Sequence, residues 1–226
     1  MRLLRRHTPG PSVLNNYDYA SNNWDCLSSS DKKQIWEEIT KMQGKLCAYC
    51  EKKIPHHASD NKKAVRHIEH FFRKGIYKEL TFEWSNLFGS CGETNRCGFY
   101  KDKQNYNDNE LIKADKEDPD DFFQFSETGE VEIKPDLKLN NKKKAEVTLR
   151  VFNLNPPNGG VKAERRRAIQ SSLPLIKNLV DIASNLLTSG ENIDDVRCLV
   201  FEEFHEKIID RSFPTAIRHV FENRMP

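Results

Sequence analysis

The sequence has no long apolar run, and this absence argues against a membrane protein. No stretch of about 18 apolar residues occurs in the 226-residue chain, so no spanning helix is expected. The N-terminal MRLLRRHTPGP is basic but lacks the apolar core of a signal peptide. Together with unpaired cysteines, this predicts a reducing, cytoplasmic environment. There is also no P-loop or other nucleotide-hydrolysing motif, no internal repeat and no low-complexity tail.

A large net charge is absent as well, because the formal net charge is only +2. The charges are nevertheless unevenly distributed. Residues 45–103 hold twelve Lys and Arg against seven Asp and Glu, residues 134–170 hold ten against three, and residues 108–130 hold nine acids against two lysines. Basic segments of this kind are usually solvated faces, and phosphate contact is the alternative. The arginine run 165–167 leaves open a solvated turn or contact with a phosphate or an acidic partner.

Cysteines are few, but four of the six form two pairs. These are Cys47 with Cys50, and Cys91 with Cys97. Two such pairs can close the four-coordinate tetrahedral shell that zinc prefers in structural sites, and Gly92 and Gly98 permit the longer second turn. The alternative is four ordinary buried thiols. The spacing favours structural zinc, and the isolated Cys26 and Cys198 are expected to be core thiols.

A carboxylate and an imidazole lie side by side between the two cysteine pairs. Glu69 and His70 end an apolar segment, and Asn86 follows in WSNL. This pair suits phosphodiester hydrolysis, because one side chain can hold a divalent cation while its neighbour takes a proton from water. His67 lies two residues before Glu69, on the same face of a strand, and could add a ligand. A Glu-His dipeptide alone is more often a surface pair, so the surrounding cysteines carry the catalytic interpretation.

The order of these motifs resembles the zinc-containing HNH endonucleases. The resemblance rests on the Cys47/Cys50 pair, IEHF, WSNLFGSC and CGFYK. A closer likeness to PtuB, the HNH subunit of Septu and retron anti-phage systems, rests on AYCEKKI, HIEHFFRK, DPDDFFQFSETGEV and TLRVFNLN. It covers residues from about 1 to 170, and the remainder more loosely. It implies that His70 is the general base, that Glu69 binds a catalytic Mg²⁺ or other divalent metal, and that Asn86 holds the loop carrying His70.

The same resemblance implies partners. Relatives work beside an ATPase of the SMC/ABC type (PtuA-like), and in retron versions also with a reverse transcriptase and its RNA–DNA product. The helical C-terminal third is then the expected docking surface. The implied role is a toxic effector that cuts nucleic acid under the control of the ATPase.

One position departs from the family pattern. HNH proteins commonly carry His or Asn directly after the last cysteine, and here that position is Gly98. The second ligand of the catalytic metal is therefore open among Asn95, Asp102 and Asn105. The competing interpretation is a zinc-ribbon adaptor that has kept the cysteines and lost the chemistry. A zinc-dependent transcription factor is a third, but no plausible recognition helix lies beside the cysteines.

The pattern and the resemblance together predict a mainly helical α+β fold built around a zinc-stabilised ββα-metal unit. The predicted segments are 1–44 (lead-in and helix), 45–106 (nuclease unit), 107–160 (acidic irregular segment and connector) and 161–226 (helical region). In the first, Ser28 and Asp31 have capping-box spacing at the start of a helix that Gly44 ends.

Further elements are expected along the chain. They are a hairpin over 46–54, a loop over 57–63, a strand over 65–72, a turn or short strand over 82–88, a helix after Cys97 and a hairpin turn at SETGE. The type of 145–154 is left open between strand and helix. Helices are expected over 161–187, which Pro174 must kink or divide, over 194–210 and over 212–223. The second of these places five apolar residues on one face: Val196, Leu199, Val200, Phe204 and Ile208.

Overall fold

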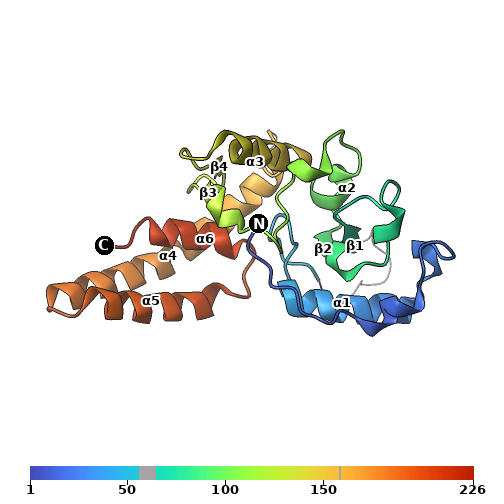
Figure 1. Ribbon diagram of the computed structural model, residues 1–226. Helices are drawn as coiled ribbons and strands as arrows, with labels where there is room; N and C mark the ends of the chain where they lie inside the picture. The colour runs from blue at the N-terminus through green and yellow to red at the C-terminus, as the bar shows by residue number, and fades with distance from the viewer. Residues whose placement is uncertain (56–64, 158) are drawn as a thin grey trace. The chain divides into compact units, whose positions relative to one another are not determined.

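The computed structural model has the predicted α+β fold, and about half of the chain is helical (Figure 1). It describes residues 1–55, 65–157 and 159–226, so the loop expected over 57–63 lies outside the described residues. None of the described helices is long and apolar enough to cross a membrane. The chain divides into two compact units. The first comprises Met1–Phe122 and Pro135–Leu154, and the second comprises Phe123–Lys134 and Asn155–Pro226.

The described residues of the first unit form a two-stranded antiparallel sheet and three α-helices. They are α1 (Ser29–Gln43), β1 (Arg66–His70), β2 (Leu87–Cys91), α2 (Cys97–Lys101) and α3 (Leu139–Val151). Short 3-10 turns lie at Ser12–Asn16, Trp24–Cys26, Lys78–Leu80, Trp84–Asn86, Asp108–Glu110 and Pro119–Asp121. In the β1–β2 pair, Glu69 is opposite Phe88 and His70 is opposite Leu87. These elements carry most of the predicted site residues: Glu69 and His70 lie on β1, Cys91 ends β2 and Cys97 begins α2.

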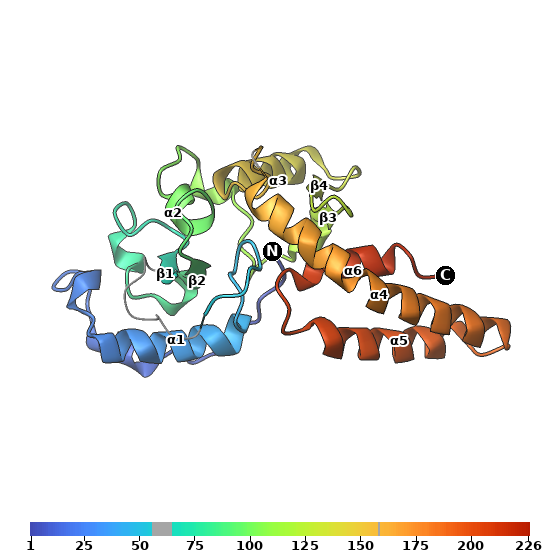
Figure 2. The same cartoon turned by 180° about the vertical axis from the view of Figure 1, so that it is seen from behind.

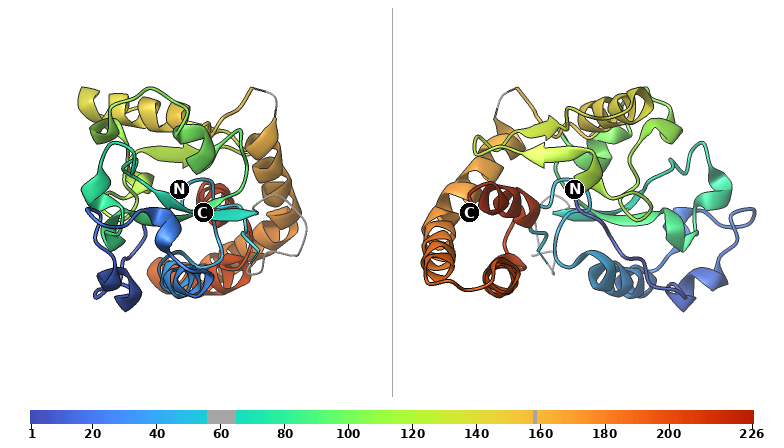
Figure 3. Two further views of the ribbon diagram at one scale, coloured as in Figure 1. Left: turned by 90° about the vertical axis from the view of Figure 1, so that its right-hand side faces the viewer. Right: turned by 60° about the vertical axis from the view of Figure 1, so that its left-hand side comes forward.

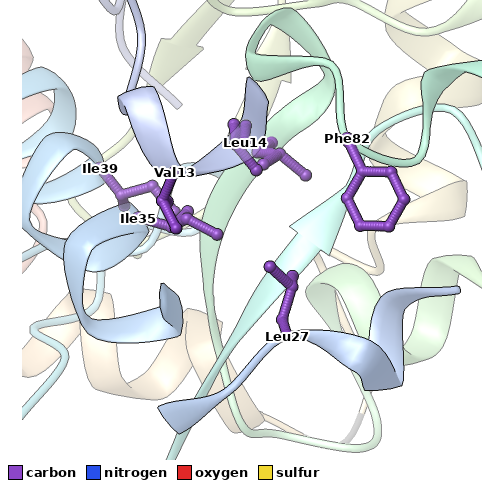
Figure 4. Close-up of a cluster of buried hydrophobic side chains, with 7 residues drawn as sticks. Val13, Leu14, Leu27, Ile35, Ile39 and Phe82 are labelled. Atoms are coloured by element: carbon purple, nitrogen blue, oxygen red, sulfur yellow. The ribbon is translucent and has the colours of Figure 1, made fainter. Parts of the chain in front are cut away.

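Helix α1 begins and ends where the local signals predict. Ser28 and Asp31 exchange side-chain and backbone hydrogen bonds in a capping box, and Gly44 ends the helix with φ +64°. The apolar face of α1 packs against the N-terminal lead-in and the start of β2. Figure 4 shows side chains from this cluster, which consists of Val13, Leu14, Leu27, Ile35, Ile39, Phe82 and Leu87. Burial of these side chains holds α1 against the sheet.

The segment whose type the sequence left open is helical. Helix α3 buries Ala145, Thr148 and Val151 on one side, which is helical spacing, and the Thr148 hydroxyl accepts a hydrogen bond from the Ile112 N–H at 2.9 Å. Just after α3, the carbonyl of Phe152 accepts a bond from the Cys97 N–H at 2.9 Å. The chain after α3 thus anchors the last cysteine.

In the second unit, the described residues form three helices and a small hairpin. Its elements are β3 (Phe123–Phe125), β4 (Val131–Ile133), α4 (Gly160–Thr188), α5 (Ile193–Ile208) and α6 (Pro214–Glu222). The hairpin turn at SETGE is present between β3 and β4 (Figure 3). Helices α4 and α5 lie side by side and antiparallel (Figure 2). Pro174 does not divide α4, which is assigned as one helix through that residue.

Several expectations about side-chain burial are wrong. Cys26 and Cys198 are both exposed rather than core thiols. On α5, Cys198 and Leu199 lie on the exposed side. The buried side is formed by residues at four-residue spacing: Val196, Val200, Phe204 and Ile208. Arg165 is buried, donates to the carbonyl of Gly129 and lies over the ring of Phe125, so contact with a phosphate is excluded for this arginine.

Candidate active site and metal centre

The four paired cysteines come together in one buried cluster. Their sulfur atoms all lie within 4.8 Å of one another. Cys47 and Cys50 come from the 46–54 hairpin, which the Leu46–Lys53 bridge closes, while the other two end β2 and begin α2. Cys97 adopts a left-handed backbone with φ +56°, a strained conformation for a residue other than glycine. This backbone conformation occurs at the residue whose sulfur completes the cluster of four.

The donor set of this cluster fits zinc. The Sγ atoms of Cys50 and Cys91 are 3.9 Å apart, close to the ~3.8 Å edge of a tetrahedron with Zn–S bonds of about 2.3 Å. Burial disfavours a thiolate at Cys47, but hydrogen bonds from the other three thiols outweigh it and lower the pKa of Cys47. Burial and the same contacts raise the pKa of Cys97. Four thiolates in this space need a cation, which is what a structural zinc ion provides.

A buried glutamine joins the cysteine hairpin to the sheet. The Gln43 amide donates to the carbonyls of Leu46 (2.6 Å) and Gly89 (2.8 Å), and its oxygen accepts from the Gly89 N–H at 2.9 Å. The end of α1 therefore fixes the first cysteine pair relative to β2, which carries the third cysteine.

Glu69 is buried on β1 between two cationic or hydrogen-bonding partners. One oxygen lies 2.8 Å from His67 Nε2, and the other forms an ion pair with Lys101 Nζ at 2.5 Å. Burial opposes ionisation, but Lys101 and His67 outweigh it and lower the pKa of Glu69. The carboxylate is thus ionised and held in one orientation.

Lys101 is fully buried, which is rare for lysine. Besides Glu69, its ammonium group bonds the carbonyls of His70 (2.6 Å) and Phe71 (3.1 Å) and lies 3.2 Å from Asp102 Oδ1. One residue of α2 therefore fixes both the carboxylate and the end of β1. Lys101 is not predictable from the sequence, since nothing in CGFYK distinguishes a buried lysine from a solvated one.

The glycine that departs from the family pattern has a local reason. A Cβ atom at Gly98 would lie 2.1 Å from Glu69 Oε2 and 2.6 Å from His67 Nε2. Because real Cβ atoms do not approach other atoms so closely, this arrangement of Glu69 and His67 requires glycine at position 98.

His70 is buried at the end of β1, and its ring is fixed by a backbone carbonyl. Its Nε2 lies 3.0 Å from the carbonyl oxygen of Thr81. Its ring meets the Trp24 ring edge-on, with the ring centroids 4.4 Å apart. A carbonyl only accepts, so Nε2 carries the proton and Nδ1 keeps a lone pair. Burial lowers the pKa of His70 to about 4. The imidazole is therefore neutral at physiological pH and can accept a proton.

Asn86 connects the two backbone segments beside His70. Its side-chain oxygen accepts from the Phe72 N–H at 2.7 Å, and its amide donates to the carbonyls of Phe72 and Leu80, each at 3.0 Å. Phe72 is two residues after His70, and Leu80 precedes Thr81, the hydrogen-bond partner of His70. Asn86 thus holds both the strand end and the loop that orients the imidazole.

These groups surround a cavity of about 380 Å³. His67, Glu69 and His70 line it together with Lys74 and Asp102. Burial and the nearby Glu69 raise the pKa of Asp102. Asn95 and Asn105, the other two candidate ligands, are not among the described residues that line this cavity. Arg73 lines the cavity as well, so the site offers two carboxylates, two imidazoles, a lysine and an arginine to a ligand.

Comparison with known proteins gives a distant relative. No family model matches the chain. The chain is similar to a Vibrio cholerae (serotype O1 biovar El Tor) protein named "Retron Vc95 putative HNH endonuclease". The two are 26% identical over 205 residues, which cover 81% of this chain and 92% of that protein. The similarity supports a nuclease function.

Proposed function

We propose that this chain is a metal-dependent HNH endonuclease that hydrolyses phosphodiester bonds in nucleic acid. The observation that carries the proposal is the state of His70, a neutral imidazole with a fixed Nε2–H, at a cavity shared with an ionised glutamate. A general base needs this combination of a free lone pair and a held ring. A zinc-ribbon adaptor, the alternative, has no use for it.

In the proposed reaction, His70 Nδ1 takes a proton from the water that attacks the scissile phosphorus. The Thr81 carbonyl stabilises the imidazolium that forms, and Asn86 keeps the ring from shifting. Lys74, which is exposed on the cavity wall, attracts the phosphate. The four thiols would hold a zinc ion that stabilises the scaffold and takes no part in the reaction.

The carboxylates fit a catalytic magnesium ion. Mg²⁺ prefers oxygen ligands and keeps several waters, so one or two carboxylates are enough from the protein. Glu69 and Asp102 both line the cavity and would hold the ion, which makes Asp102 the preferred second ligand. When bound, Mg²⁺ would neutralise charge on the phosphate and the leaving 3′ oxygen.

The proposed biological role is that of a PtuB-like effector controlled by a PtuA-like ATPase of the SMC/ABC type. The support is the similarity to a retron protein together with the absence of a nucleotide-hydrolysing motif in the sequence. The second unit, with its α4–α5 pair, is the proposed docking part, and a reverse transcriptase with its RNA–DNA product is a further proposed partner.

The test compares His70→Ala with His205→Ala, an exposed histidine on α5, in the complex with the ATPase. Loss of the general base should lower the cleavage rate about 10²–10⁴-fold in the first variant only. Glu69→Ala should lose activity that added magnesium partly restores, and zinc content should not change. If His70→Ala cuts as fast as the parent, the nuclease proposal is wrong and the adaptor takes its place.

A further inference from the structure

A second cavity adjoins the candidate active site. It has a volume of about 370 Å³, within the range of small-ligand sites. Trp24 and Lys74 line both cavities, and Thr81, whose carbonyl orients His70, lines the second. A ligand in the second cavity would therefore contact the same Trp24 and Lys74 side chains as a substrate in the candidate active site.

Two aromatic side chains line this second cavity. Trp24 is partly buried and stacks on Phe82, with ring centroids 6.1 Å apart, so its orientation is fixed. Tyr19 is 52% exposed and, in the described part of the chain, makes no hydrogen bond or ring contact of its own. A fixed indole beside a half-exposed phenol is a surface on which a flat ring can stack.

The polar lining matches a nucleotide. Lys74 and Lys78 are exposed, and neither is in an ion pair within the described residues. Asn22 and Asn23 offer side-chain NH2 groups, because their side-chain oxygens already accept the N–H groups of Asp18 and Asp25, and Asp25 is the single acid in the lining. Amide and carboxylate groups pair with base edges, and ammonium groups that are not in ion pairs attract phosphates. Aromatic rings, lysines and amides are the combination that binds unpaired nucleotides.

We infer that the second cavity binds a nucleobase next to the scissile phosphate, and that the enzyme therefore prefers single-stranded nucleic acid, DNA or RNA, to a duplex. The inference rests on the proposed nuclease function. In a duplex, each base is stacked on both faces and paired along its edge, so it cannot enter such a cavity without leaving the helix. An unpaired base enters without that cost.

Binding without magnesium tests the inference apart from catalysis. Fluorescently labelled single-stranded DNA and RNA oligonucleotides would be compared with duplexes of the same sequence. The variants are Tyr19→Ala and Lys78→Ala. Their controls are Leu139→Ala, an apolar residue that is 81% exposed on α3, and Lys41→Ala, an exposed lysine on α1. None of these side chains is buried, so the fold should be kept.

The parent should bind single strands about tenfold or more tightly than duplexes. Tyr19→Ala should remove about tenfold of that affinity, the contribution of one stacked base, while the two controls leave it unchanged. A difference between the DNA and RNA arms identifies the polymer. Equal affinity for single strands and duplexes, or a Tyr19→Ala variant that behaves like Leu139→Ala, would overturn the inference.

Magnesium-dependent cleavage separates this inference from the proposed function. If the parent cuts duplexes as fast as single strands and Tyr19→Ala changes neither rate, the base site is wrong and the nuclease stands. If Tyr19 determines single-strand binding but the complex with the ATPase cuts nothing, the base site stands and the nuclease does not.

Discussion

Replacing Lys101 by methionine tests how far the first unit depends on one buried ammonium group. Methionine keeps the unbranched length of the side chain and removes the charge. Glu69 would then be a buried carboxylate with only His67 beside it, and the carbonyls of His70 and Phe71 would lose a donor. Breaking a buried ion pair from one side costs about 3–5 kcal/mol, and the orphaned carbonyls favour the upper end of that range.

The assay is equilibrium urea unfolding followed by tryptophan fluorescence. All three tryptophans, Trp24, Trp36 and Trp84, lie in the first unit, so the signal reports on that unit alone. Lys103→Met, an exposed lysine two residues further on, is the control and should change stability by no more than about 0.5 kcal/mol. Zinc content is measured for each variant, because loss of the metal would destabilise the unit independently.

A double variant identifies the cause. In Glu69→Gln/Lys101→Met the buried charge is gone, so the double variant should be more stable than Lys101→Met alone, with a coupling of about 0.5–3 kcal/mol. A zinc-loaded Lys101→Met protein within about 0.5 kcal/mol of the parent would refute the reasoning. A double variant no more stable than the single one would show that the ion pair is not responsible.

Three further predictions concern zinc, pH and activation. The purified chain should carry about one zinc per molecule, and Cys47→Ser or Cys91→Ser should prevent folding, because structural zinc supplies roughly 10 kcal/mol; metal-free but folded protein would contradict this. Because burial lowers the pKa of His70 to about 4, the unfolded chain binds a proton that the folded chain does not between about pH 6.5 and pH 4. Stability should therefore fall by about 2 kcal/mol more in the parent than in His70→Gln between about pH 7.5 and pH 5, and equal losses in urea titrations would contradict it. The isolated chain should be nearly inert in nuclease assays and active only with its ATPase partner, so rapid cleavage by the chain alone would refute control by a partner.

Features determined by residues close in sequence were predictable. Ser28 and Asp31 are three residues apart, and the SETGE turn is five residues long, so local geometry decides both. The cysteine pairs were predictable for another reason: two pairs of soft ligands have a common use that brings them together. In each case the interacting residues lie close together in the sequence, or their side-chain type indicates the ion that would join them.

Burial of polar groups was not predictable in the same way. Arg165 and Lys101 are buried because distant backbone carbonyls and aromatic rings accept them, and those partners are far away in sequence. The prediction that Cys198 is a core thiol was wrong for the opposite reason. Four other apolar residues of α5, at four-residue spacing, already fill its buried side, so Cys198 is left exposed. The type of 145–154 was open because alternation and helical spacing coexist there, and only contacts such as that of Thr148 with Ile112 decide it.

The charges around Glu69 bear on how the proposed nuclease takes up its metal. Two carboxylates, Glu69 and Asp102, share the ammonium of Lys101, so the three groups carry a net charge of about −1 rather than −2. Gly98 adds no ligand, and the close approach of Glu69 leaves no room there for one. The protein alone should therefore bind a divalent cation less tightly than a site with two free carboxylates would. The phosphate of the substrate supplies the missing negative charge, and we expect magnesium and nucleic acid to increase each other's affinity.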